Sequence, residues 1–168
     1  MNKNDIYILL NKNKIPYEIN EHKPVYKMEN LETLNLPHSD CDGKNLFLKD
    51  DKKNYYLITI KGNKKINLKD FKNKYHTHSL SFTSPTELKE LMNLIPGEVG
   101  PFGLLNDKEA KIKFYIDEAF MTDSHLIGVH PNDNTATVWL KTNDLVSLIK
   151  EHGSEFEFFE LNNWLKYF

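Results

Sequence analysis

Residues 43–61 read GKNLFLKDDKKNYYLITIK, in which two β-rich runs flank a polar pentapeptide. The runs are Asn45–Lys49 and Tyr55–Lys61, and residues 50–54 connect them. A short polar connection between two such runs predicts a β-hairpin. We therefore expect a sheet to be built around these two strands.

Helices and further strands are predicted on both sides of this hairpin. An apolar stripe of Ile6, Leu9 and Leu10 predicts a first helix over 5–13. The motif Ser84-Pro85-Thr86-Glu87 is a capping box that opens a helix closed near 95–97. We expect a last helix capped by Asn143-Asp144 and ended by Gly153. The remaining helical segments are 28–36 and 68–75, and the remaining strands are 17–22, 112–116, 126–129, 135–140 and 156–161.

These elements predict an α+β fold. Six to seven short strands alternate irregularly with about four helices, which favours neither a repeat nor a doubly wound sheet. A length of 168 residues fits about one domain. We expect a single domain with a mixed, curved or barrel-like β-sheet and flanking helices.

The composition excludes several classes of protein. No apolar run approaches the ~20 residues of a membrane span, and the segment Met1–Asp5 leads into a polar amphipathic stretch rather than a secretion signal. The one cysteine, Cys41, can form neither an internal disulfide nor a thiolate zinc site alone. We expect a cytoplasmic protein without a membrane partner, a metal or a cofactor.

Positive charge is concentrated in the middle of the chain. All 22 basic residues are lysines, and residues 44–74 hold ten lysines against three aspartates. From residue 142 onward, two lysines face five acidic residues. Such a lysine cluster is typical either of solvated loops or of a surface that faces a polyanion. Any bound phosphate would be met by ammonium groups or backbone N–H groups, since no guanidinium is available.

Three segments carry residues that a plain fold does not require. Residues 43–48 place Lys44 and Asn45 at the start of a strand, and residues 95–103, IPGEVGPFG, form a stiff loop that can aim N–H groups at an anion. Residues 128–137 place His130 between a strand and a polar turn. Each has an ordinary interpretation as well: a strand-edge lysine, a simple connection and a structural histidine.

In their order and spacing, these segments resemble the prolyl-tRNA synthetase-associated editing domain family, the YbaK-like aminoacyl-tRNA deacylases. The match is nearest to the Ala-tRNA(Pro) deacylase branch. The matching residues are Lys44-Asn45-Leu46-Phe47-Leu48, the Gly97-x-x-x-Pro101 loop with Phe102-Gly103-Leu104-Leu105, and Gly128-Val129-His130-Pro131 with Asn134-Thr135-Ala136-Thr137. The resemblance implies an editing domain over residues 1–161 and leaves 162–168 as a C-terminal tail or the start of a linker.

The activity that the resemblance implies is hydrolysis of alanine wrongly esterified to proline tRNA. The implied partners are tRNA(Pro) mischarged with alanine and prolyl-tRNA synthetase, with no DNA, metal or cofactor. Water would attack the ester with help from the 2′-hydroxyl of the tRNA itself. An aminoacyl ester is already activated, so positioning and oxyanion stabilisation can suffice.

The resemblance also assigns roles to individual residues. Lys44 would hold either the phosphate of the terminal adenosine or the ester region, and Asn45 would orient the substrate. Backbone N–H groups from Gly97 to Pro101, including that of Gly100, would polarise the ester carbonyl. His130 and Val129 would shape the amino-acid pocket. The substrate-binding set is completed by Pro101, Phe102 and Asn134, and the expected tRNA-binding lysines are Lys61, Lys64, Lys65 and Lys72.

Other functions fit the same sequence. One is a deacylase of the same family that removes cysteine or another small amino acid, and another is a non-catalytic tRNA-binding module of a synthetase. A small-molecule binding domain would lack salt-dependent affinity for tRNA. Replacement of Lys44 separates the first two classes, because a binder would lose one phosphate contact whereas a catalyst would lose turnover.

Overall fold

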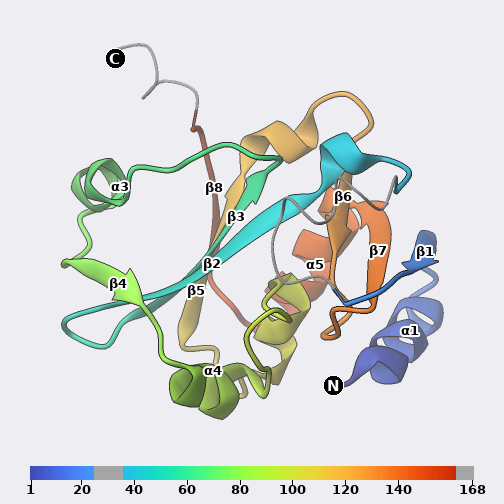
Figure 1. Ribbon diagram of the computed structural model, residues 1–168, viewed down its shortest axis with the longest axis horizontal. Helices are drawn as coiled ribbons and strands as arrows, with labels where there is room; N and C mark the ends of the chain where they lie inside the picture. The colour runs from blue at the N-terminus through green and yellow to red at the C-terminus, as the bar shows by residue number, and fades with distance from the viewer. Residues whose placement is uncertain (25–35, 162–168) are drawn as a thin grey trace.

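The computed structural model describes residues 1–24 and 36–161, and all structural statements below refer to these ranges (Figure 1). The helix expected over 28–36 lies outside the described residues except for Leu36, and so does the expected tail 162–168. The predicted α+β class is confirmed, with the strands divided between two sheets.

The predicted hairpin lies at the centre of a five-stranded mixed sheet. Strands β2 (Gly43–Asp50) and β3 (Tyr55–Lys61) pair antiparallel, with Phe47 opposite Leu57. The sheet order is β4-β2-β3-β5-β8, completed by β4 (Leu80–Phe82), β5 (Ile112–Asp117) and β8 (Phe156–Phe159). Strand β3 pairs parallel with β5, and β5 pairs parallel with β8.

A second, antiparallel sheet has the order β1-β7-β6. Its strands are β1 (Tyr17–Glu21), β6 (Leu126–Val129) and β7 (Ala136–Lys141). One parallel β-bridge, between Asp42 and Gly128, connects the start of β2 to β6. The two sheets therefore meet at the residues that precede Lys44 and His130.

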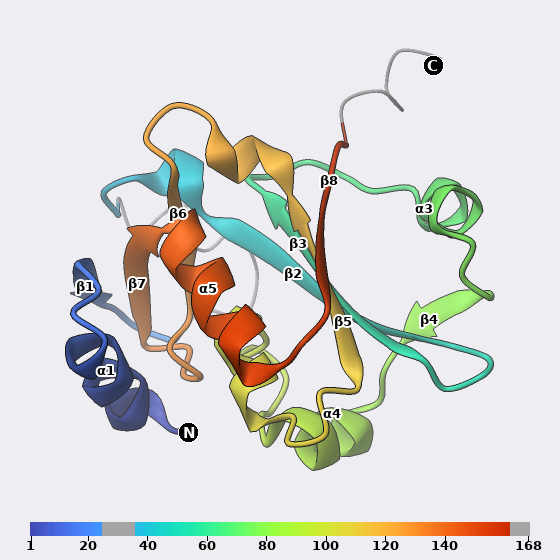
Figure 2. The ribbon, with the colours of Figure 1, turned by 180° about the vertical axis from the view of Figure 1, so that it is seen from behind.

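The described residues include four α-helices and three short 3₁₀ segments. They are α1 (Lys3–Lys12), α3 (Leu68–Tyr75), α4 (Pro85–Met92), α5 (Thr142–His152), η1 (Ser39–Cys41), η2 (Pro101–Asn106) and η3 (Glu118–Met121). Helices α1 and α3 lie at opposite ends of the molecule (Figure 1). Helix α5 lies between β7 and β8 on the side seen in Figure 2. None of the helices described is long and apolar enough to cross a bilayer.

Local capping signals account for the helix ends only in part. The capping box predicted at Ser84 is present, because the Ser84 side chain accepts a hydrogen bond from Glu87 N–H. The predicted Asn143-Asp144 cap is wrong: α5 begins at Thr142, whose hydroxyl donates to the carbonyls of Phe120 and His125. Helix α4 ends at Met92, before the predicted 95–97, where Asn93 adopts a left-handed conformation.

Strand β3, at the centre of the five-stranded sheet, is buried on both faces, which explains the nearly continuous apolar run 55–61. On one face, Phe47 and Leu57 join the main core with α4, α5 and the apolar side of the second sheet. On the other face, Ile58 and Ile60 join an aromatic cluster that includes Phe71 of α3. Strand β4 is three residues long, too short for its pattern to be recognised in the sequence.

Candidate active site

The three segments singled out in the sequence meet at one point. A Cβ atom built on Gly100 would lie 3.8 Å from His130 O, 3.9 Å from His130 N and 4.0 Å from Asn45 Nδ2. Asn45 comes from β2, Gly100 from the loop before η2, and His130 from the end of β6. The structure thus brings together Asn45, Gly100 and His130, which are far apart in the chain.

The loop 95–103 is held in shape by its own hydrogen bonds. Gly97 has φ +96°, a left-handed conformation that favours glycine, and the N–H of Glu98 donates to Ile95 O at 3.1 Å. The N–H of Gly103 donates to Gly100 O at 2.9 Å. The N–H of Gly100 itself makes no hydrogen bond within the described ranges, so it is available to a carbonyl oxygen.

The side-chain amide of Asn45 is oriented by Thr59. The Thr59 hydroxyl donates to Asn45 Oδ1 at 2.7 Å from the directly opposite position on β3, and Thr59 is fully buried. With its oxygen engaged in this way, Asn45 presents its NH₂ group, two donors, toward Gly100. Asn45 and the free N–H of Gly100 therefore form a pair of donors suited to a carbonyl that gains negative charge.

We expect Thr59→Val to lower the single-turnover rate on a mischarged tRNA by about ten-fold, because the Asn45 amide loses the hydrogen bond that orients it. Valine keeps the shape of threonine, so the fold should be retained, as circular dichroism would verify. Thr59→Ser restores the hydroxyl and should recover most of the rate. Equal rates in the valine and serine variants would contradict a positioning role for Thr59.

His130 is held as a neutral imidazole. Burial lowers its pKa, and its Nδ1 lies 3.4 Å from Ala136 O, so Nδ1 carries the proton. The charge interaction with His22 also acts to lower the pKa. His22 in turn bonds to Thr137 Oγ1 at 2.9 Å. At neutral pH, His130 therefore offers an uncharged ring and an acceptor at Nε2.

One face of the three-stranded sheet, which carries Gly128, Thr137 and Trp139, lies beside the place where Asn45, Gly100 and His130 meet. Gly128 lies opposite Trp139 across the β6–β7 pair, and a Cβ on Gly128 would come within 2.2 Å of the Trp139 ring and 2.9 Å of Asp42 Oδ1. Only glycine fits this close approach. The face also carries Thr137, which is buried, whereas the opposite face packs its apolar side chains into the main core.

Lys44 directly precedes Asn45 on β2 and has no partner in the described residues. It is half-buried on β2 opposite Ile60, and its ammonium makes no hydrogen bond or ion pair with the described chain. Because side chains alternate along a strand, Lys44 shares a face with Asp42, and Asn45 points to the other side. Lys44 lies two residues after Asp42, and His130 lies two residues after Gly128, so both follow the Asp42–Gly128 bridge at the same spacing.

Other predicted substrate contacts are placed differently. Val129 and Phe102 both lie in the main apolar core, so the structure does not bring their side chains to this site. For Val129 the reason is strand alternation, because its neighbours Gly128 and His130 take the polar face. Pro101 and Asn134 are buried beside these segments, in η2 and in the β6–β7 loop.

The predicted tRNA-binding lysines differ in their availability. Lys64 Nζ lies 3.3 Å from the buried carboxylate of Asp117, and Lys61 Nζ donates to Ala119 O. Lys72, half-buried on α3, places its Nζ 3.5 Å from Ser79 Oγ, and Lys65 is exposed with no hydrogen bond or ion pair in the described residues. Lys61 is paired with Gly43, next to Lys44, so the lysine-rich stretch starts at the site and continues toward α3 (Figure 1).

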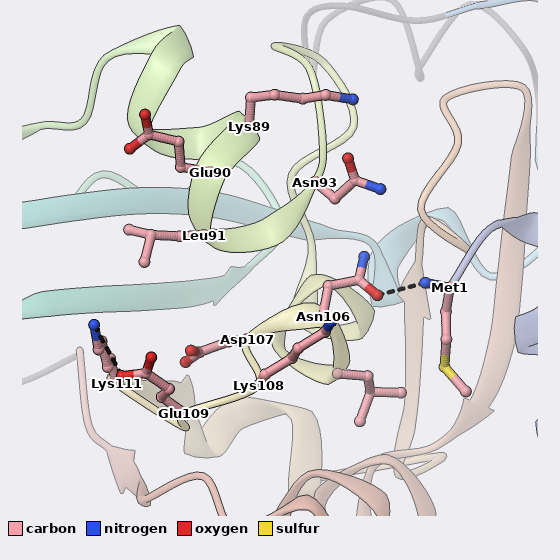
Figure 3. A pocket seen from close by; sticks show the side chains of 11 residues that line it. Met1, Lys89, Glu90, Leu91, Asn93, Asn106, Asp107, Lys108, Glu109 and Lys111 are labelled. Carbon is pink, nitrogen blue, oxygen red and sulfur yellow. Dashed lines mark hydrogen bonds and ion pairs between the residues drawn. The ribbon is translucent and has the colours of Figure 1, made fainter.

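A separate pocket of about 770 Å³ lies between α4 and the loop after η2 (Figure 3). None of the predicted site residues lines it. Its charges are balanced and partly paired with one another, as in the 3.0 Å contact between Lys111 and Glu109. Across residues 1–24 and 36–161, no group of three or more His, Cys, Asp or Glu side chains is placed to hold a metal ion.

One site residue, Thr59, was missed in the sequence, and the expected role of Asp42 differs from its position in the structure. Thr59 was hidden in an apolar strand, although a single hydroxyl residue among YYLITIK is a usable signal for a buried polar contact. The sequence predicts Asp42, one residue before the first segment, as part of a turn and as a neighbour that helps to hold the Lys44 ammonium, but the described residues contain no ion pair between Asp42 and Lys44. Its contact with Gly128 depends on a pairing between segments about 86 positions apart, which no local pattern reveals.

Comparisons with known proteins agree on one family. Residues 22–148 match the sequence profile of the aminoacyl-tRNA editing domain. The chain is 38% identical over 160 residues to the prolyl-tRNA editing protein ProX of Acetoanaerobium sticklandii, covering 95% of this chain and 97% of that protein. It is 33% identical over 146 residues to the prolyl-tRNA synthetase associated domain-containing protein 1 of Mus musculus, covering 82% of this chain and 83% of that protein.

Solved structures show the same fold. A scaffold protein from a computational epitope-grafting design aligns with a TM-score of 0.73 at 15% identity, over 95% of each chain. A candidate trans-editing enzyme for prolyl-tRNA synthetase aligns with a TM-score of 0.65 at 16% identity, over 86% of each chain. The predicted fold family is confirmed by these alignments.

Proposed function

The chain belongs to the aminoacyl-tRNA editing domain family, and from this premise we propose that it hydrolyses the ester of Ala-tRNA(Pro) in trans. At the coarser level the protein is an aminoacyl-tRNA deacylase of the prolyl-tRNA editing group. The observation that supports the proposed chemistry most directly is the convergence of Asn45, Gly100 and His130.

The proposed reaction requires hydrogen-bond donors from the protein and no side-chain nucleophile, because water attacks the ester. The ester carbonyl would accept hydrogen bonds from the Gly100 N–H and the Asn45 amide while water attacks its carbon, and the tRNA 3′-oxygen would leave. No serine or cysteine side chain lies among the residues that meet there, and an aminoacyl ester is activated enough not to need one. The 2′-hydroxyl of the tRNA would take part in moving the proton. Lys44 would supply positive charge next to the ester.

Selection of alanine is an exclusion by size. A synthetase site built for proline rejects a smaller amino acid weakly, because lost contacts are worth only about 1–3 kcal/mol. A second site that admits alanine and excludes proline corrects this error. The half-buried His130 and the close approach of the Trp139 ring to Gly128, which admits no Cβ, favour a small amino acid.

The lysines of residues 44–74 suit a tRNA partner. They begin at the site, with Lys44 and Lys61 on neighbouring strands, and continue to the exposed Lys65 and the half-buried Lys72. A cytoplasmic location and an association with prolyl-tRNA synthetase accompany this proposal, since the mischarged substrate is made there.

The experiment that tests the proposal is deacylation of a panel of charged tRNAs by the purified protein. We expect fast release of alanine from Ala-tRNA(Pro) and a rate near the uncatalysed one for Pro-tRNA(Pro). Cys-tRNA(Pro) and Ser-tRNA(Pro) measure the neighbouring specificities, and a preference for cysteine would replace alanine as the proposed substrate. Equal rates on alanine and proline esters would remove the editing function.

Affinity for tRNA should fall steeply with salt. The slope of log K against log salt is expected to be about −0.7 to −0.9 per phosphate neutralised. Lys65→Glu together with Lys72→Glu should weaken binding without changing the rate at saturation. Lys64 is left intact because its reversal would place a second carboxylate against Asp117. Lys12→Glu on α1, at the opposite end of the molecule (Figure 1), is the matched control. Unchanged binding in the double variant would place the tRNA on another face.

A further inference from the structure

Four aspartates in the described chain are buried, and three of them have clear structural partners. Asp117 accepts from two backbone N–H groups and from Lys64, and Asp107 accepts from Ile112 N–H. Asp50, at the far end of β2, accepts four hydrogen bonds, from Lys52 N–H, Asn54 N–H, the Asn54 amide and the Tyr56 hydroxyl. These carboxylates are satisfied by the fold itself.

Asp42, just before the start of β2, is the exception. It is 6% exposed, yet its carboxyl group makes no hydrogen bond or ion pair with the described chain. The carboxyl oxygens are not among the fully buried side-chain atoms of the described chain, so the group is open to a ligand although the residue as a whole is buried. A nearly buried carboxylate that the fold leaves without a partner points to a ligand that completes it. Burial, with a smaller contribution from the charge of Asp40, raises the pKa of Asp42 to about 7, whereas the pKa of Asp50 is lowered.

The position of Asp42 links it to the substrate site. Its Oδ1 lies 2.9 Å from the point where Gly128 would carry a Cβ, on the polar face with Trp139. Gly100 contacts the backbone of His130, two residues further along the chain, which corresponds to about 7 Å in an extended strand. In an aminoacyl ester the α-nitrogen is two bonds from the carbonyl carbon. With a hydrogen bond of about 3 Å at each end, at the Gly100 N–H and at the Asp42 carboxylate, one bound ester can span that distance.

We propose that the Asp42 carboxylate receives the α-ammonium group of the aminoacyl ester. This inference rests on the proposed function, because it assigns a contact within the same substrate. The α-ammonium is the one cation that every aminoacyl ester brings into the site. Its charge would pair with the Asp42 carboxylate, which has no partner in the described chain. The contact fixes which way the amino acid enters, so that its side chain meets His130.

The test uses unhydrolysable ligands, so that binding is measured without turnover. One ligand is tRNA(Pro) that carries alanine through a 3′-amide bond. The other is the same tRNA with a lactyl group on the same 3′-amide bond, so that a hydroxyl group replaces the α-ammonium group. At pH 7 the wild-type protein should bind the alanyl ligand about ten- to a hundred-fold more tightly, the range of one charge-assisted hydrogen bond. Asp42→Asn, and Asp42→Ser as a second neutral variant, should bind both ligands equally.

Asp50→Asn is the matched control, since it neutralises the buried carboxylate at the opposite end of β2 from Asp42. It should keep the preference for the alanyl ligand while lowering the unfolding temperature, whereas Asp42→Asn should unfold at or above the wild-type temperature at pH 8. A preference that survives in Asp42→Asn would overturn the inference. The deacylation panel is independent of this measurement, so a protein that binds as expected but releases no alanine would contradict only the proposed function.

Discussion

Lys44→Ala should lower the single-turnover rate on Ala-tRNA(Pro) by about a hundred- to a thousand-fold. One preorganised electrostatic contact to a charged transition state is worth about 2.7–4 kcal/mol. The Lys44 ammonium is available for that contact because no group of the described chain pairs with it. Lys44→Arg should also fail, since a planar guanidinium cannot take the place of a compact ammonium. The measurement is single-turnover deacylation at saturating protein.

The same strand supplies a matched control for Lys44. Lys49 Nζ lies 2.6 Å from Glu87 Oε1, and this contact contributes most to lowering the pKa of Glu87 to about 2. Lys49→Ala should therefore reduce stability above about pH 4 and leave the rate per folded molecule nearly unchanged. The Lys49 contribution is lost as the pH falls through the lowered pKa of Glu87. Near-normal turnover in a folded Lys44→Ala protein would exclude Lys44 from the reaction.

Local chemistry made the central elements of the fold predictable. The β2–β3 hairpin follows from two apolar runs joined by five polar residues, and the start of α4 follows from the Ser84 capping box. The division into two sheets was not predictable in this way. It depends on the pairing of β7 with β1 and β6, and the partners β1 and β7 are more than a hundred residues apart.

The site was predictable only through the order of its three segments. Each segment alone has an ordinary interpretation, and only the resemblance to a family predicts that the three segments form one site. The sequence did not predict which face of the sheet each of these side chains occupies. Val129 and His130 are neighbours in sequence, yet only His130 is on the side of the site, because the sheet assigns Val129 to the core.

Substitution of two nearby glycines, Gly100 before η2 and Gly103 within it, should separate an effect on activity from an effect on stability. Gly100 is fully extended, with φ −172° and ψ 173°, so alanine can adopt its backbone conformation. An added methyl group would make ordinary van der Waals contacts, 3.8 Å from His130 O and 4.0 Å from Asn45 Nδ2. That methyl group would occupy the space in which we place the ester carbonyl.

Gly100→Ala should therefore fold normally and lose about a hundred-fold in single-turnover rate, the cost of misplacing a reacting group by about 1 Å. Gly103→Ala, three residues later, should show the reverse pattern. Its Cβ would lie 2.9 Å from Leu94 Cδ1 and 3.0 Å from Met92 Sδ, an overpacking that costs about 1–3 kcal/mol of folding free energy. Thermal unfolding and deacylation well below the unfolding temperature measure both variants. A stable Gly100→Ala protein with an unchanged rate would show that the ester binds somewhere else.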